Sequence, residues 1–159
     1  MEGNMNICNL VLTSKGGAGK SFVSWVIAQW GMTKGYNMYC ADTDPANPTF
    51  AGYKALQVDY IDVANEKMLM DRDRFDDLLE KLASHDGFSV VDTGATMFYP
   101  FLNHAIEVKT FEALRDGLIT PGQHASPQSR ATFLNDGAGD CALLIIRAIF
   151  SRLARDSGT

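Results

Sequence analysis

The residues best suited to chemistry form one glycine-rich segment near the start of the chain, Lys15-Gly16-Gly17-Ala18-Gly19-Lys20-Ser21. Glycines let backbone N–H groups converge on an anion and adopt backbone angles that are closed to other residues. In such a segment Lys20 would reach the β- and γ-phosphates of a nucleoside triphosphate, and the Ser21 hydroxyl would hold Mg²⁺. The general phosphate-loop pattern has a glycine where Ser14 stands, so this segment is a variant of that pattern.

Three acidic residues follow apolar stretches that are typical of buried strands. Asp42 and Asp44 come directly after one such stretch, and Asp92 ends another. Ligands of parallel sheets bind at the carboxyl ends of the strands, where phosphate-binding folds keep a metal-side carboxylate. We therefore expect these three carboxylates to meet Lys20 and Ser21 at one rim of a sheet, although either Asp42 or Asp44 could instead cap a turn.

The elements that must position these residues can be predicted from periodicity. An apolar strand over 6–13, the glycine turn, a helix over 22–34 and a strand over 37–41 make a βαβ unit. A third strand is expected over 88–92, an amphipathic helix over 71–84 and a further helix over 100–115. In the first helix, apolar residues recur at spacings of three and four, as a helix requires: Phe22, Val23, Val26, Ile27 and Trp30. Core or helix-packing roles are expected for Trp25 and Trp30 of this helix.

These elements predict an α/β fold, namely a three-layer phosphate-loop fold with a mostly parallel sheet. The segment from 117 to 159 is atypical. Within it, Cys141-Ala142-Leu143-Leu144-Ile145-Ile146 could be a strand or part of a final helix, because periodicity does not distinguish them. We expect a single domain over 1–159, with a recognisable nucleotide-binding core over 1–116 and a tail over 117–159.

Composition narrows the class of protein. The 159 residues carry a net charge of −5, which argues against a strongly basic nucleic-acid module. No run of about 18 apolar residues and no secretory signal is present, so we expect a cytoplasmic protein without a transmembrane segment. The three cysteines, Cys8, Cys40 and Cys141, form no CxxC pair and are expected to be buried free thiols.

Taken together, the motifs resemble those of the ParA/MinD ATPases. The segment from Lys15 to Ser21 is similar to their deviant Walker A motif. Asp42-Thr43-Asp44-Pro45 resembles their switch I segment, and Val90-Val91-Asp92-Thr93-Gly94 resembles their Walker B motif and the start of switch II. The segments 44–50 and 92–96 look most like the plasmid TraL/StbB branch, and the resemblance covers about residues 5–115.

The resemblance implies ATP and Mg²⁺ as cofactors, with the triphosphate held by Lys15, Gly16, Gly17, Ala18, Gly19, Lys20, Ser21 and Phe22. Lys15, Lys20 and Asp44 would be catalytic. Lys15 would cross a homodimer interface to the partner's nucleotide, and Asp44 would position the attacking water. Ser21 would hold the metal ion, Asp92 would hold it through water, and Asp42 would lie near its water shell.

The implied function is Mg²⁺-dependent ATP binding and slow hydrolysis that act as a dimerisation switch in plasmid stability or conjugative transfer. Its partner would be an unknown plasmid or conjugation protein. ParA-type dimers also bind DNA nonspecifically, but we expect Arg147, Arg152 and Arg155 to form a solvated helix face rather than a DNA contact.

The chain departs from the family in its last part, where no adenine-binding motif is recognisable. It is therefore expected to be a minimal member, a fragment, or a chain whose end is out of the ancestral reading frame, with a sheet incomplete on its C-terminal side. Two alternatives remain open: a nucleotide-binding module without turnover, and a small-molecule kinase. The Lys15-Gly16-Gly17 start and the Asp42/Asp44 pair argue against the kinase.

Overall fold

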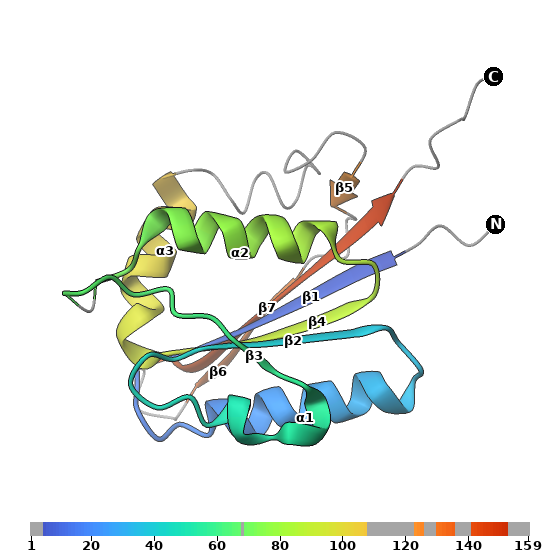
Figure 1. The fold of residues 1–159 in the computed structure, drawn as a ribbon, viewed down its shortest axis with the longest axis horizontal. Helices are drawn as coiled ribbons and strands as arrows, with labels where there is room; N and C mark the ends of the chain where they lie inside the picture. Colours follow the sequence, from blue (N-terminus) through green and yellow to red (C-terminus); the bar gives the residue numbers. More distant parts are fainter. Residues whose placement is uncertain (1–4, 68, 108–122, 126–129, 136–140, 153–159) are drawn as a thin grey trace.

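The computed structural model describes residues 5–67, 69–107, 123–125, 130–135 and 141–152 (Figure 1). Helix α1 lies on one face of a sheet, and α2 and α3 lie on the other. The fold is therefore α/β. The strands are β1 (Met5–Leu12), β2 (Met38–Thr43), β3 (Asp59–Tyr60), β4 (Phe88–Thr93), β5 (Gln123–Ala125), β6 (Arg130–Asn135) and β7 (Cys141–Arg152). The α-helices are α1 (Lys20–Thr33), α2 (Arg72–Ser84) and α3 (Phe98–Glu107), and short 3-10 turns span Phe50–Gly52, Lys54–Leu56 and Ala95–Met97.

The sheet has a parallel core that brings the predicted site strands together. Its order is β3-β2-β4-β1-β7-β5, and β6 also pairs with β7. Strands β1 to β4 pair in parallel, and the register sets Asp42 directly opposite Asp92. Strand β7 continues the sheet antiparallel to β1, so the segment 141–146 is a strand and not a helix. Arg147 and Arg152 lie on the same strand, so the helix face expected for them is wrong, and Arg155 lies outside the described residues. The division into a core and a tail at residue 116 stays a prediction.

The core on the side of α2 and α3 follows the predicted amphipathic pattern. Leu10 and Leu12 of β1 and Val91 of β4 pack there with the buried face of α2. That face consists of Phe75, Leu78 and Leu82, as the periodicity of 71–84 predicts. Helix α2 begins one residue later than predicted, because Asp71 is its N-cap and accepts a hydrogen bond from the Arg74 N–H.

The buried face of α1 is not formed by the large apolar residues that recur along this helix. The fully buried residues of this helix are Ser24, Ala28 and Gly31, whereas Phe22 and Trp30 are exposed. A Cβ at position 31 would lie 2.7 Å from the sulfur of Met38, so the helix backbone sits directly against the sheet. Only small residues fit such a close approach, and the large apolar residues are therefore displaced to the flanks and the outer surface.

Helix α3 begins at Phe98, and residues 108–115 of the predicted helix lie outside the described residues.

Cys8 and Cys40 are buried free thiols, and burial raises their pKa values to about 12 and about 11. Among the helices that the structure describes, none has the length and apolar character needed to span a bilayer.

Candidate functional site

The glycine loop joins the carboxyl end of β1 to the start of α1. Gly17 and Gly19 have φ values of +75° and +78°, a left-handed conformation that side chains with a Cβ rarely adopt. Space around both residues is open, so the backbone angle and not crowding demands glycine here. Gly19 is also the N-cap of α1 and supplies no side-chain cap, and no acidic residue lies in the first turn. This helix N-terminus is thus suited electrostatically to an anion.

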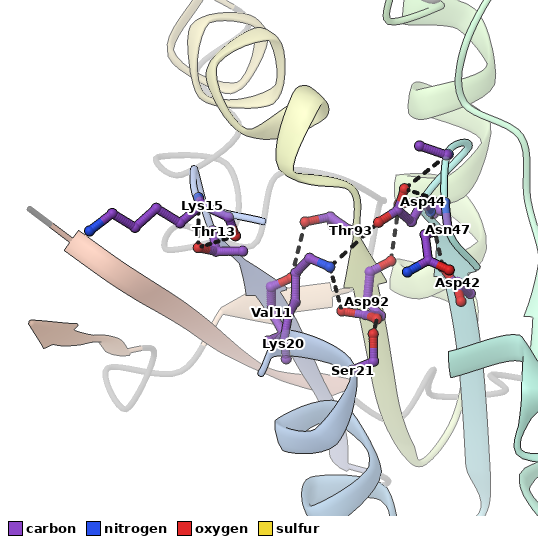
Figure 2. A network of polar contacts seen from close by, with 12 residues as sticks. Val11, Thr13, Lys15, Lys20, Ser21, Asp42, Asp44, Asn47, Asp92 and Thr93 are labelled. Atoms are coloured by element: carbon purple, nitrogen blue, oxygen red, sulfur yellow. Dashed lines mark hydrogen bonds and ion pairs between the residues drawn. The ribbon is translucent and has the colours of Figure 1, made fainter. Parts of the chain in front are cut away.

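Lys20 stands at the centre of the site, between two of the predicted carboxylates. Its Nζ lies 3.5 Å from Asp44 Oδ2 and 3.8 Å from Asp92 Oδ1 (Figure 2). The side chain of Lys20 is 11% exposed and that of Asp92 is fully buried, so the surrounding water screens these charges only weakly. Lys20, Asp44 and Asp92 therefore lie together at one rim of the sheet, as the sequence predicts.

Ser21 and Asp92 form the second part of the site. The Ser21 hydroxyl donates a 2.6 Å hydrogen bond to Asp92 Oδ2. Burial raises the pKa of Asp92 from 3.8 to about 6, although the Ser21 hydrogen bond and the Lys20 charge act in the opposite direction. Oδ1 of Asp92 is buried and accepts no hydrogen bond from the described residues.

This pair fits the requirements of a magnesium ion. Mg²⁺ is commonly held by one or two protein oxygens together with waters and substrate phosphates, rather than by an all-protein cage. A hydroxyl beside a carboxylate whose buried Oδ1 accepts no hydrogen bond from the described residues matches that donor set. Among the residues that the structure describes, no cluster of three or more His, Cys, Asp or Glu side chains could hold a metal ion without such help.

The two aspartates after β2 have different surroundings. Asp42 is fully buried, and its oxygens accept hydrogen bonds from the N–H groups of Asp44 at 3.0 Å and of Ala51 at 2.9 Å. Burial raises the pKa of Asp42, while these two hydrogen bonds lower it. The structure thus gives Asp42 the turn-forming role that the sequence left open, and its role near a metal ion stays a prediction.

Asp44 both shapes the loop after β2 and faces Lys20. Its Oδ1 accepts hydrogen bonds from the N–H groups of Ala46 and Asn47, which leaves Oδ2 toward Lys20. A Cβ at Gly94 would lie 3.1 Å from Asp44 Oδ1, so a glycine at this position lets the carboxylate approach the turn after β4. The role of Asp44 in positioning a water molecule stays a prediction.

Lys15 does not join this cluster. Its backbone N–H donates to Thr13 Oγ1 at 3.1 Å, and Figure 2 shows its side chain extending away from Lys20, Asp44 and Asp92. The side chain is exposed. A contact with the nucleotide of a second chain, which the resemblance implied for Lys15, stays a prediction.

A cavity of about 460 Å³ opens above the loop. Lys15 is the one predicted phosphate-loop residue that does not line it, and Asp44 does. The lining also includes residues that sequence reasoning missed: Ala46, Asn47, Thr49, Tyr53, Ala95 and Thr96. Ala46, Asn47 and Thr49 lie in a segment that the sequence already singled out, whereas nothing in the sequence pattern pointed to Tyr53.

Comparison with known proteins gives two informative matches. A protein of Escherichia coli called Protein TraL is 40% identical over 108 residues, which is 68% of this chain and 44% of that protein. Another Escherichia coli protein of the same name is 42% identical over 98 residues, which is 62% of this chain and 40% of that protein. The chain thus spans less than half the length of these relatives. No family model matches the chain, and no solved structure matches it.

These matches correct the assignment to the ParA/MinD ATPases. Both relatives carry the name TraL and not that of a ParA/MinD ATPase. The ATP-hydrolysing dimerisation switch that was inferred from that assignment is therefore not supported. The predicted link with plasmid conjugation, in contrast, agrees with the name of the relatives.

Proposed function

We propose that this chain binds ATP together with Mg²⁺ at the glycine loop, and that it does so as a component of plasmid conjugative transfer. The name of its relatives supports the setting, in which an unidentified plasmid or conjugation protein would be its partner. The parallel core, with helices on both faces and a glycine turn between β1 and α1, supports the finer assignment to the phosphate-loop nucleotide-binding folds.

The observation that carries the proposal is the position of Lys20. Lys20 lines the cavity together with the glycine-loop residues from Gly16 to Gly19. Its ammonium group is held at 3.5 Å and 3.8 Å from two carboxylates, so a cation is fixed where phosphates would enter. A buried ammonium group in this position would neutralise phosphate oxygens, and the α1 N-terminus would add N–H donors.

Ser21 and Asp92 would hold the metal ion. When bound, Mg²⁺ supplies positive charge that bridges phosphate oxygens and compensates the buried carboxylate. The Ser21 hydroxyl would exchange its hydrogen bond with Asp92 for metal coordination. The metal ion would add a second positive charge, beside that of Lys20, for the buried Oδ1 of Asp92, which accepts no hydrogen bond from the described residues.

Isothermal titration calorimetry with ATP and Mg²⁺ tests the proposal. Wild type should bind with a stoichiometry near one per chain, and Lys20→Ala should lose binding by at least about 100-fold, because a largely desolvated charge pair with phosphate is removed. Lys34→Ala is the matched control, since Lys34 is an exposed lysine at the opposite end of the same helix. Equal binding by wild type and Lys20→Ala would contradict the proposal.

Enzymatic turnover stays a prediction of the sequence and is not part of this proposal. Release of inorganic phosphate can be followed in the titrated samples.

A further inference from the structure

Three aromatic side chains form a continuous row beside the glycine loop. Phe22 belongs to the first turn of α1 and is 60% exposed. Its ring stacks on Trp25 with centroids 5.9 Å apart and planes at 28°. Trp25 in turn lies 6.1 Å from the ring of Tyr53, which also packs edge-on against the buried Phe50 at 6.2 Å.

Tyr53, at one end of the row, packs against the core, whereas Phe22, at the other end, is exposed to solvent. Phe50 is fully buried, and Trp25 and Tyr53 are partly buried against the core cluster between α1 and the sheet. Covering an exposed phenylalanine ring with an apolar or aromatic group removes apolar surface from water, which is favourable. This ring is therefore available to a ligand without any rearrangement of the core.

The same cavity contains both the phosphate loop and two of these rings. Phe22 and Tyr53 line it together with the residues from Gly16 to Ser21. Phe22 directly follows Ser21, so its ring stands where the loop runs into the helix. A ligand that fills this cavity would therefore meet both the charged and N–H groups of the loop and an aromatic surface.

We propose that Phe22 and Tyr53 form a stacking subsite for the base of the bound nucleotide, so that the site takes a nucleotide rather than inorganic polyphosphate. This inference rests on the proposed function and deepens it. Every nucleotide base has a flat π surface that can stack on an aromatic side chain, whichever base it is. Inorganic tripolyphosphate offers the same phosphate chemistry with no ring, so it would leave the aromatic row uncovered.

The experiment compares ATP and tripolyphosphate, each with Mg²⁺, by calorimetry on wild type and variants. Wild type should bind ATP at least about 10-fold more tightly than tripolyphosphate, since stacking on one aromatic platform is worth about that factor. Phe22→Ala and Tyr53→Ala should each weaken ATP binding by about 10-fold and leave tripolyphosphate binding unchanged. Tyr53→Phe retains the ring and should bind ATP as wild type does, which separates stacking from a loss of folding.

Trp30→Ala is the matched control. Trp30 is an aromatic residue of the same helix, 44% exposed, that does not line the cavity. This variant should bind both ligands as wild type does. Equal affinity of wild type for the two ligands, or equal weakening of both by Phe22→Ala, would overturn the subsite and leave the proposed phosphate site intact. Failure of wild type to bind either ligand would overturn the proposed function itself.

Discussion

The Asp92 carboxylate gives the sharpest test of the electrostatics of this site. Its side chain is fully buried, and burial raises its pKa from 3.8 to about 6. Since one pKa unit corresponds to about 1.36 kcal/mol, the ionised carboxylate costs the folded protein about 3 kcal/mol relative to the unfolded chain. The Ser21 hydrogen bond and the Lys20 charge lower this pKa, but the effect of burial is larger, so the pKa stays raised at about 6.

The sign of the pH dependence follows from this difference. Because the pKa of Asp92 is higher in the folded protein, the folded state binds more protons than the unfolded chain between about pH 4 and pH 6. The contribution of Asp92 to stability is therefore fully present below about pH 4, and it is lost as the pH rises through about 6. We expect Asp92→Asn to remove this dependence and to raise the free energy of unfolding at about pH 7.5 by about 1–3 kcal/mol in metal-free buffer.

Urea unfolding at about pH 4 and pH 7.5, with a chelator present, measures this effect. Asp77→Asn is the control, because it makes the same change of residue type at an exposed position on α2. The same Asp92→Asn protein should no longer gain stability from Mg²⁺ with ATP. If Asp92→Asn proves less stable than wild type at about pH 7.5 without metal, then the contacts with Ser21 and Lys20 outweigh burial and the reasoning is refuted.

Three further substitutions test the scaffold by urea unfolding at neutral pH. Asp71→Ala removes the N-cap of α2 and should cost about 1 kcal/mol, and an unchanged midpoint would show that the cap is not needed. Gly31→Ala places a Cβ 2.7 Å from the Met38 sulfur and should cost about 1–3 kcal/mol, unless α1 can shift freely on the sheet. Asp42→Ala leaves two backbone N–H groups without their acceptor and should cost about 2 kcal/mol or more, whereas full stability would mean that the turn after β2 holds without it.

The convergence of Lys20, Asp44 and Asp92 could be predicted from sequence because each residue is tied to the end of an element. Strands of a parallel βαβ unit end at the same rim, so a residue directly after a strand has little freedom in where it lies. The glycine pattern was equally informative, since positive φ at Gly17 and Gly19 leaves few other residue types. Local constraints of this kind are visible in the order of residues.

The packing face of α1 and the aromatic row could not be predicted in this way. Periodicity selects the large apolar residues, but the face of α1 is set by how closely its backbone approaches Met38 and Phe88 of neighbouring strands. Tyr53 reaches the cavity because the chain folds back along α1 after β2, and no local pattern encodes that contact. The turn-forming role of Asp42 was equally hard to predict, because it depends on hydrogen bonds from the N–H groups of Asp44 and Ala51.

A crystal structure of the protein with Mg²⁺ and a non-hydrolysable ATP analogue is the most direct test of the central claim. The account predicts phosphate density within hydrogen-bond distance of Lys20 Nζ and the loop N–H groups, with the metal ion at Ser21 on the side of Asp92. An analogue bound elsewhere, or a loop that stays empty at saturating analogue, would contradict it.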